Sequence, residues 1–423
     1  MSYHMMCMES LESRRLLAGV TIITHGFEDD TTGWVSTMAD AIANRAGGKS
    51  VVAIYTLNVG LDSNNNLAVL GLVHQAGTST VTSASSGETI IKLNWSTVSD
   101  GTFSTVQVGD VVAAWLMATP SGSMAGLPAL DELPIHLIGH SRGASLNTEI
   151  AGDLGEHNIW VDQFTSLDPH PVDGGSNNPL GVSFGDEPMI TWSNIVFADD
   201  YWRTNGNGDS IDPNGLPVAG AFTQSLAASV QADFVDSAHS SVHAWYFGTI
   251  DLHASSDSAG INIPGAWYDD SSALPPRAGT GFDFSLIAGG QRPLSGLAIS
   301  HGGTAARVDP KERGTQWADL GDISLGSDSV SPGKSVKIKF TEEDRQSSSK
   351  VTFYLDSDKN PYNDNSVRTL ARGTFAEASA VTGETLKAGT SGVLAGKYYV
   401  YARIVAADGL VRYAYAQQAL TIT

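Results

Sequence analysis

Residues 133–154 read LPIHLIGHSRGASLNTEIAGDL and decide the fold. Residues 133–138 have the composition of a short buried strand, and residues 144–154 place apolar side chains at helical spacing. Between them lies Gly139-His140-Ser141-Arg142-Gly143, a G-x-S-x-G pattern. Its glycines leave room for a chain that turns from strand to helix within two residues. We therefore expect Ser141 to lie on this turn as a nucleophile.

The chain around this turn alternates between strand and helix patterns from residue 19 to about residue 252. Such alternation predicts an α/β fold with a mostly parallel central sheet covered on both faces, and ligand sites beyond the carboxyl ends of the strands. The other predicted strands are 20–24, 50–57, 89–95 and 160–167, and the other predicted helices are 34–45 and 105–117.

The 423 residues suffice for two or three domains. We expect an N-terminal tail over 1–18, the α/β catalytic domain over 19–252, an irregular extension or linker over 253–320, and an all-β sandwich over 321–423. The last assignment depends on short alternating strands predicted at 335–340, 350–355, 393–406 and 411–422. Tyrosines on the final strands, at 398, 399, 401, 413 and 415, are interpreted as packing residues, with a binding stripe as the alternative.

The chain carries 24 Lys and Arg against 45 Asp and Glu, a net charge of −21. A surface of this charge repels phosphate backbones, so we expect no nucleic-acid partner. The single cysteine, Cys7, excludes an internal disulfide. No apolar run reaches 18 residues, so we expect no transmembrane segment. Composition does not indicate the oligomeric state.

Residues 11–17, LESRRLL, resemble the Leu-Glu-Pro-Arg-x-Leu-Leu element near the N-termini of large surface or exported bacterial proteins, with Ser13 in place of proline. This resemblance implies an extracellular or cell-surface location. Residues 1–15 contain no apolar stretch of the signal-peptide kind. A short basic amphipathic tail is the alternative interpretation.

A nucleophilic serine needs a histidine base, and the base works better when a carboxylate holds its other ring nitrogen. Asp168 ends the strand predicted over 160–167 and begins the stiff sequence DPHP, so we interpret it as the acid. An aspartate that merely caps a turn is the alternative. Downstream, residues 236–247, DSAHSSVHAWYF, hold two candidate bases, His239 and His243.

A predicted helix cap at Ser240 or Ser241 would place His239 on the loop before the helix, which favours it as the base. His243 would then lie on the first helical turn and stays the alternative. The backbone amides of Arg142 and Phe27 are the predicted oxyanion-hole donors, because Arg142 follows the nucleophile and Phe27 follows Gly26 at the end of the first strand. His25 and His140 are expected to support these turns.

Residues 356–360, DSDKN, place oxygen-bearing side chains at calcium-loop spacing. The glycine and distal glutamate of an EF-hand are missing, so a plain Asp/Asn turn is the alternative. The predicted chemistry itself requires no metal and no cofactor.

Several motifs together resemble the pancreatic-type lipase family of α/β hydrolases over about residues 19–250. They are THGF at 24–27, LNW at 93–95, IHLIGHSRG at 135–143, SLDP at 166–169 and AH at 238–239. The resemblance implies a carboxylester hydrolase with Ser141 as nucleophile, Asp168 as acid and His239 as base, with Phe27 and Arg142 at the oxyanion hole.

Two features depart from that family. Arg142 brings a charge beside the nucleophile, either to meet an anionic substrate group or to pair with a nearby carboxylate. The family's disulfide-closed lid is absent, and residues 171–238, with aromatic side chains at 192, 197, 201 and 202, are the segment that could cover the site.

The sequence thus predicts a serine hydrolase that cleaves lipid or other hydrophobic esters through an acyl-enzyme on Ser141. A peptidase or amidase using the same triad, and a non-catalytic cell-surface protein with a hydrolase fold, are the alternatives.

Overall fold

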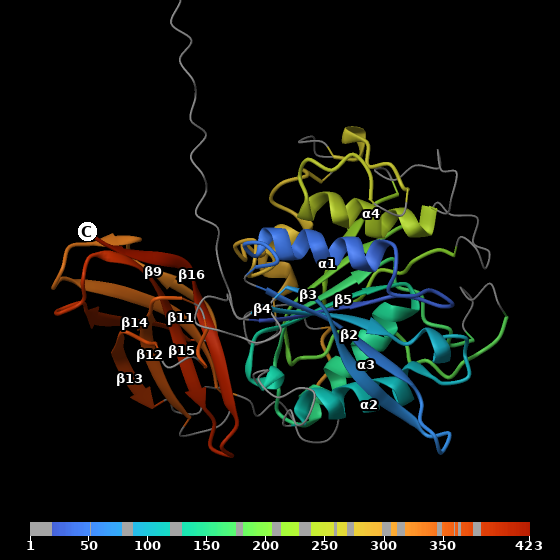
Figure 1. Cartoon of the computed structure of the whole chain (residues 1–423), viewed down its shortest axis with the longest axis horizontal. Helices are drawn as coiled ribbons and strands as arrows, with labels where there is room; N and C mark the ends of the chain where they lie inside the picture. The colour runs from blue at the N-terminus through green and yellow to red at the C-terminus, as the bar shows by residue number, and fades with distance from the viewer. Residues whose placement is uncertain are drawn as a thin grey trace, which may run out of the picture.

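The computed structural model describes residues 19–423 except 51, 78–87, 119–128, 175–180, 205–212, 228–237, 258–259, 269–274, 298–305, 311–317, 345–348, 359, 363–364 and 375–381. The LESRRLL element and Cys7 therefore lie outside the described residues. The described chain forms a larger unit around a mixed sheet and a separate all-β region beside it (Figure 1).

The larger unit is built on eight strands in the order β3-β2-β4-β1-β5-β6-β7-β8. Neighbouring strands are parallel except β2 and β3, which are antiparallel. The strands are β1 (Val20–Thr24), β2 (Val52–Leu61), β3 (Leu67–Gly77), β4 (Glu88–Asn94), β5 (Ile135–His140), β6 (Val161–Leu167), β7 (Ile195–Trp202) and β8 (Phe222–Ser225).

Helices cover both faces of this sheet (Figure 1). One face carries α1 (Trp34–Arg45) and α4 (Ala238–Ile250), and the other carries α2 (Thr105–Met117) and α3 (Arg142–Glu156). Helix α2 begins with a capping box in which Ser104 and Gln107 satisfy each other's backbone amides. The predicted bounds of the first two helices along the chain agree with the structure.

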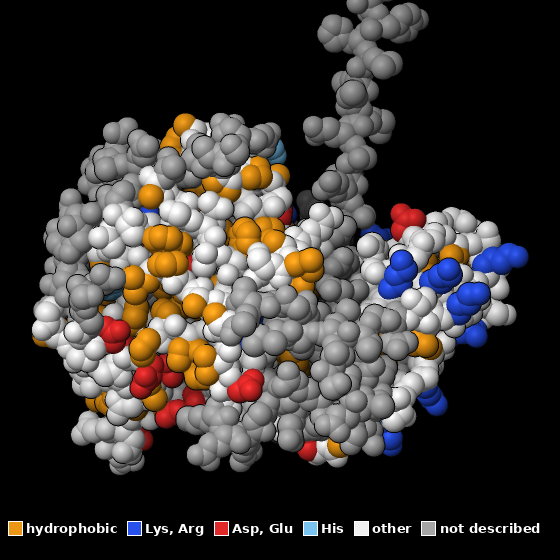
Figure 2. Space-filling model, turned by 180° about the vertical axis from the view of Figure 1, so that it is seen from behind, with side chains coloured by type: hydrophobic (Ala, Val, Ile, Leu, Met, Phe, Trp, Pro, Cys, Tyr) orange, Lys and Arg blue, Asp and Glu red, His pale blue; other side chains and the backbone are white. Residues whose placement is uncertain are grey.

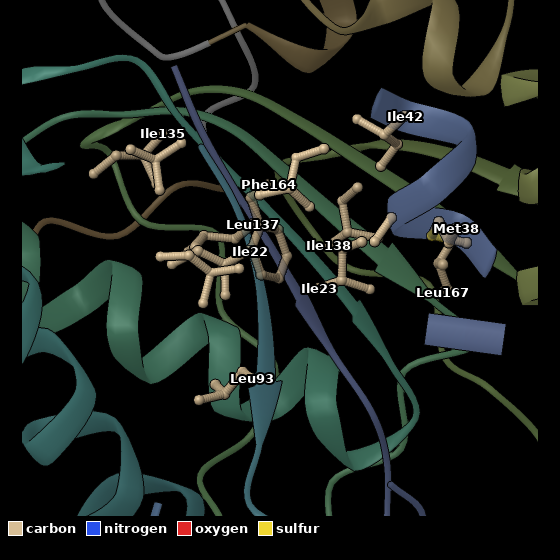
Figure 3. Packing of buried hydrophobic residues seen from close by; sticks show 14 of the residues in the cluster. Ile22, Ile23, Met38, Ile42, Leu93, Ile135, Leu137, Ile138, Phe164 and Leu167 are labelled. Carbon is tan, nitrogen blue, oxygen red and sulfur yellow. The ribbon is translucent and has the colours of Figure 1, made fainter. Parts of the chain in front are cut away.

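The central strands β1, β5 and β6 are buried on both faces, which explains their nearly continuous apolar sequences. Side chains such as Ile22, Leu137, Ile138 and Phe164 are fully buried between the two helix layers (Figure 3). The strand that leads to Ser141 is thus held rigidly at the middle of the sheet.

The all-β region consists of a five-stranded sheet, β10-β16-β15-β12-β13, and a three-stranded sheet, β14-β11-β9. Its apolar core includes Phe340 and Phe353, whose ring centroids are 5.2 Å apart. The strands are β9 (Ala318–Leu325), β10 (Ser329–Val330), β11 (Ser335–Asp344), β12 (Lys350–Asp356), β13 (Arg368–Thr374), β14 (Thr382–Gly389), β15 (Gly396–Val405) and β16 (Val411–Ile422).

The connection between the two regions packs on the larger unit through short 3-10 helices. In η5 (Gly281–Phe284), Phe282 lies edge-on to Tyr246 of α4, and Phe284 contacts Phe197 of β7. The other two turns are η4 (Gly265–Trp267) and η6 (Leu294–Gly296). The segment predicted as irregular is therefore an ordered covering of the sheet where the structure describes it.

The two regions meet at η3 (Leu130–Glu132), just before β5. Arg412 of β16 donates to the carbonyl oxygens of Asp131, at 2.6 Å, and Leu133, at 3.3 Å. Tyr362 donates to Glu132 Oε2 at 3.0 Å. Tyrosines from β15 and β16 join the apolar core of the larger unit, which supports their interpretation as packing residues: Tyr401, Tyr413 and Tyr415.

The segment 171–238 was considered as a possible cover of the site because of its aromatic side chains at 192, 197, 201 and 202. These side chains have other positions. Trp192 donates to the carbonyl oxygen of Thr148 on α3 at 2.9 Å, and residues 197, 201 and 202 belong to β7. Helices among the described residues are too short or too polar to cross a membrane. Seen from behind, Lys and Arg side chains lie mainly on the all-β region, whereas acidic and hydrophobic side chains are spread over the larger unit (Figure 2).

Candidate active site

Ser141 occupies the turn between β5 and α3 with φ of 57° and ψ of −129°. Both neighbouring glycines are required by close packing. A Cβ at Gly139 would lie 2.5 Å from the carbonyl oxygen of Gly143, and a Cβ at Gly143 would collide with the carbonyl oxygen of His25. A non-glycine residue held at positive φ is strained, and such strain is concentrated at functional sites.

The segment after β1 lies directly against Ser141. A Cβ added to Gly26 would be 2.9 Å from the Cβ of Ser141. His25 fixes this segment, since its Nδ1 lies 2.9 Å from the carbonyl oxygen of Gly26 and its Nε2 lies 3.3 Å from the amide nitrogen of Trp95. The Trp95 indole in turn donates to the carbonyl oxygen of His25 at 2.9 Å. The expected supporting role of His25 agrees with these contacts.

Phe27 follows Gly26, which packs against Ser141, and Arg142 is the first residue of α3. The first amides of a helix have no acceptor within the helix. Both amides are thus positioned on the two segments that border Ser141, and their role as oxyanion donors stays a prediction.

Asp168 and His239 are brought together although 71 residues separate them. Nδ1 of His239 lies 2.6 Å from Oδ2 of Asp168, and both side chains are buried. Asp168 follows β6 with φ of 47°, so the chain turns sharply at this residue. The expected loop position of His239 is wrong, because α4 begins at Ala238 and His239 lies in its first turn. Ser240 and Ser241 therefore lie inside the helix and do not cap it.

Arg203, the residue after β7, also holds Asp168. Its backbone nitrogen donates to Oδ1 at 2.9 Å, and its side-chain Nε lies 3.7 Å from Oδ2. Burial raises the pKa of Asp168 to about 7, and the charge of Arg203 opposes this rise. A side chain at Gly215 would collide with Oδ1, so this position must stay small. Sequence reasoning missed Arg203, whose only signal was its place at the end of a strand.

His140 and His243 lie behind His239. His140 Nε2 is 3.1 Å from the carbonyl oxygen of His239, and the two rings are 4.5 Å apart. Burial lowers the pKa of His140 to about 3, so this ring is neutral. His243 stacks on Trp34 at 4.5 Å, and its Nδ1 lies 3.6 Å from Asp257 Oδ2. The alternative base therefore lies near a different carboxylate, at a distance too long for a hydrogen bond.

Burial also lowers the pKa of His243 well below its usual value. A buried neutral imidazole stacked on an indole packs as a flat apolar side chain. Of the two candidate bases, the structure places only His239 against Asp168.

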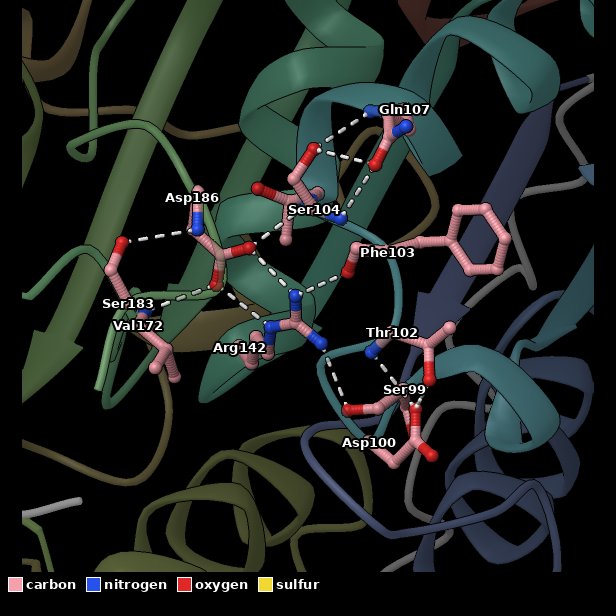
Figure 4. Close-up of polar contacts among 12 residues, drawn as sticks. Ser99, Asp100, Thr102, Phe103, Ser104, Gln107, Arg142, Val172, Ser183 and Asp186 are labelled. Carbon is pink, nitrogen blue, oxygen red and sulfur yellow. Dashed lines mark hydrogen bonds and ion pairs between the residues drawn. The ribbon is translucent and has the colours of Figure 1, made fainter.

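The side chain of Arg142 is fully buried and lies in a polar cluster (Figure 4). Its Nε and Nη2 bind the carboxylate of Asp186 at 2.7 Å each. Nη1 and Nη2 also donate to the carbonyl oxygens of Ser99 and Phe103. Of the two roles considered for Arg142, pairing with a carboxylate is the one observed.

Asp186 completes this cluster, and sequence reasoning gave no indication of it. Its carboxylate accepts a third and a fourth hydrogen bond from the backbone amides of Thr105, at the start of α2, and Val172. One ion pair therefore joins α3, which follows Ser141, to α2, to the loop at 99–103 and to the chain that leaves Asp168.

Comparisons with known proteins add little. The chain matches no family model and no curated protein. It is similar to a candidate cell surface hydrolase from Lactobacillus plantarum, with 9% identity, a TM-score of 0.29 and coverage of 60% of this chain and 95% of that one.

Two further solved structures cover a smaller part of the chain. A superoxide reductase from Ignicoccus hospitalis has 12% identity and a TM-score of 0.18, over 25% of this chain and 82% of that one. The sporulation control protein Spo0M from Bacillus subtilis has 10% identity and a TM-score of 0.19, over 25% and 49%. Scores this low do not establish a common fold, so the function is argued from the site itself.

Proposed function

We propose that the chain is a serine hydrolase of carboxylic esters with an α/β-hydrolase catalytic unit. The observation that carries the proposal is the 2.6 Å pairing of His239 with buried Asp168, at the sheet edge where Ser141 is held in its strained turn. Nucleophile, acid and base follow each other along the chain in the order Ser141, Asp168, His239, which is the order of that fold.

The chemistry follows from these positions. Because Nδ1 of His239 faces Asp168, Nε2 is left to take the proton of the Ser141 hydroxyl as its oxygen attacks the ester carbonyl. The oxyanion is stabilised by the amides of Phe27 and Arg142. Nε2 then gives the proton to the departing alcohol, which leaves an acyl-enzyme, and a water molecule activated by the same histidine releases the acid.

The substrate we propose is a lipid or another hydrophobic ester. Phe27, beside the oxyanion position, stacks on Phe184 at 5.7 Å, and both rings are only partly buried. An acyl chain fits against such an aromatic surface better than a charged group does. Arg142 is fully engaged with Asp186 and supplies no charge to the substrate. A cell-surface or extracellular location remains part of this proposal.

A labelling experiment tests the proposal. A fluorophosphonate probe should react with the full chain and fail to react with Ser141→Ala. Nitrophenyl esters of increasing acyl length should then be cleaved much faster than matched anilides. Cleavage of anilides at a comparable rate would point to an amidase instead. Absence of both labelling and turnover would identify a non-catalytic protein.

A further inference from the structure

In the loop after β12, three side-chain oxygens accept hydrogen bonds from backbone amides of the same loop. Asp356 Oδ1 accepts from the amide of Ser357 at 2.7 Å, and Asp358 Oδ1 accepts from that of Asn360 at 2.8 Å. Asn360 Oδ1 accepts from the amide of Tyr362 at 3.0 Å. Residues 356, 358 and 360 thus each hold a backbone amide of this loop with one side-chain oxygen.

Asp356 is the unusual member of this loop, since it is only 1% exposed. Its second oxygen, Oδ2, is buried and makes no hydrogen bond in the part of the chain that the structure describes. The ion pairs of the described residues include none to Asp356. A buried carboxylate without a cation is costly, and it either takes up a proton or binds a positive ion.

Asp62 provides a comparison in a turn that is less buried. Its Oδ1 also accepts two loop amides, those of Asn64 and Asn66, and the residue is only partly buried. The second oxygen of Asp62, Oδ2, lies 3.5 Å from the side-chain nitrogen of Asn66. In contrast, Oδ2 of Asp356 is buried and receives no hydrogen bond from the described residues. The two aspartates thus share the same turn geometry. They differ in their second carboxylate oxygen, which is buried without a hydrogen bond at Asp356 and not at Asp62.

We propose that this loop binds a divalent cation of the calcium type through Asp356, Asp358 and Asn360. Oxygens at positions 1, 3 and 5 of a loop, together with carbonyl groups and water, suit the 6–8 oxygen ligands of Ca²⁺. Among the described residues, no three or more His, Cys, Asp or Glu side chains are grouped so that they could bind a metal ion, and the proposed site has two carboxylates and one amide oxygen. With only two carboxylates, the site belongs to the weak class, with dissociation constants of about 0.1–1 mM.

The cation site has a structural consequence because the same loop reaches the larger unit. Tyr362, whose amide is held by Asn360, places its hydroxyl 3.0 Å from Glu132 and 3.3 Å from the carbonyl oxygen of Ala129. An ion bound by Asp356, Asp358 and Asn360 therefore also fixes the contact between the all-β region and η3.

Terbium provides a direct test on the full chain, because Tb³⁺ replaces Ca²⁺ and emits when a nearby tyrosine is excited. Tyr399 lies close to the loop, since it is the partner of Asp356 in the pairing of β12 with β15. We expect saturable Tb³⁺ emission that Ca²⁺ displaces. We also expect Ca²⁺ at ten times its dissociation constant to raise the unfolding temperature by about 3 °C over EDTA.

Asp356→Asn should reduce the emission at least tenfold and abolish the Ca²⁺-dependent shift, while its unfolding temperature in EDTA equals or exceeds that of the unmodified chain. Asp62→Asn, the matched change in the less buried turn, should alter neither. If Asp356→Asn fails to fold, Asp358→Asn serves for the same comparison. The proposal is overturned if the unmodified chain shows no emission and no shift at about 10 mM Ca²⁺, or if the loop variant responds as the control does.

Discussion

Arg203 holds the carboxylate of Asp168 with its backbone and its side chain at once. The amide donates to Oδ1 at 2.9 Å, and the guanidinium Nε lies 3.7 Å from Oδ2, which also receives His239. The buried acid therefore stands between a permanent cation and the imidazole that it orients. A carboxylate in this position stays ionised at a lower pH than burial alone would allow.

The first prediction concerns the positive charge of Arg203. Asp168 must be ionised to hold the Nδ1 proton of His239, so kcat/KM should rise with pH through the pKa of the acid, near 7. Arg203→Gln removes a charge that lowers this pKa, and the midpoint of the acidic limb should move up by about one unit or more. Activity measured from pH 5 to 9 checks this, with Arg203→Lys as the control that keeps the charge. An unchanged midpoint in Arg203→Gln would show that the arginine is only structural.

The second prediction separates the two histidines. His239→Ala should lower kcat by about 10³-fold or more while the protein stays folded, because the base is lost. His243→Ala should retain activity within about tenfold, but should destabilise the fold by about 2–4 kcal/mol, since a buried ring stacked on Trp34 is removed. Ester turnover and denaturant unfolding give the two readouts. The reverse pattern would make His243 the base.

The third prediction concerns the ion pair of Arg142 and Asp186. Arg142→Met leaves a buried carboxylate without its cation and should cost about 3–5 kcal/mol in the free energy of unfolding. Arg142→Lys keeps the charge but cannot make both contacts, so an intermediate loss is expected. Urea unfolding measures these losses. Adding Asp186→Leu to Arg142→Met should recover part of the stability, and a further loss in the double variant would contradict this account.

The fourth prediction is a pH dependence of stability. Burial, reinforced by the charge of Asp153, raises the pKa of Glu149 on α3 to about 8. A carboxyl whose folded pKa lies above its unfolded pKa stabilises the fold when protonated, and this contribution is lost as the pH rises from about 4.5 to 8. Glu149→Gln should therefore raise the unfolding temperature at pH 8 by several degrees and hardly at all at pH 4.5. Equal shifts at both values would rule out the titration of Glu149 as the cause.

Local patterns were sufficient to predict the elements that surround Ser141. The 12-residue helix after Gly33 was predicted with its observed bounds, and the strand predicted over 133–138 lies two residues further along the chain, at Ile135–His140. Strand β7 was missed and interpreted as part of a covering segment, because it contains Asp199 and Asp200 in its middle. Both carboxylates are buried, and one oxygen of each accepts hydrogen bonds from side chains on β6. Such compensation across strands leaves no pattern along the chain.

Contacts between residues far apart in the sequence also limited the prediction of the candidate active site. Ser141, Asp168 and His239 could be proposed because each stands at a predictable element end or in a recognisable motif. Arg203 and Asp186 could not, since a single charged residue after a strand or in a loop looks like any surface residue until its partner is known. The start of α4 was misplaced for a simpler reason: serine favours helix caps, but Ser240 and Ser241 follow the first residue of the helix.

Ser141 and Asp168 both keep positive φ angles, of 57° and 47°, that glycine would adopt without strain. Each costs the native state on the order of 1–3 kcal/mol. Selection for heat resistance alone, with no demand for turnover, would therefore favour glycine at position 141. At position 168 the same change would leave the buried guanidinium of Arg203 without its carboxylate, a loss of about 3–5 kcal/mol that exceeds the strain relieved. Stability and chemistry therefore oppose each other at Ser141, and a thermostabilised form of this chain has to gain its stability elsewhere.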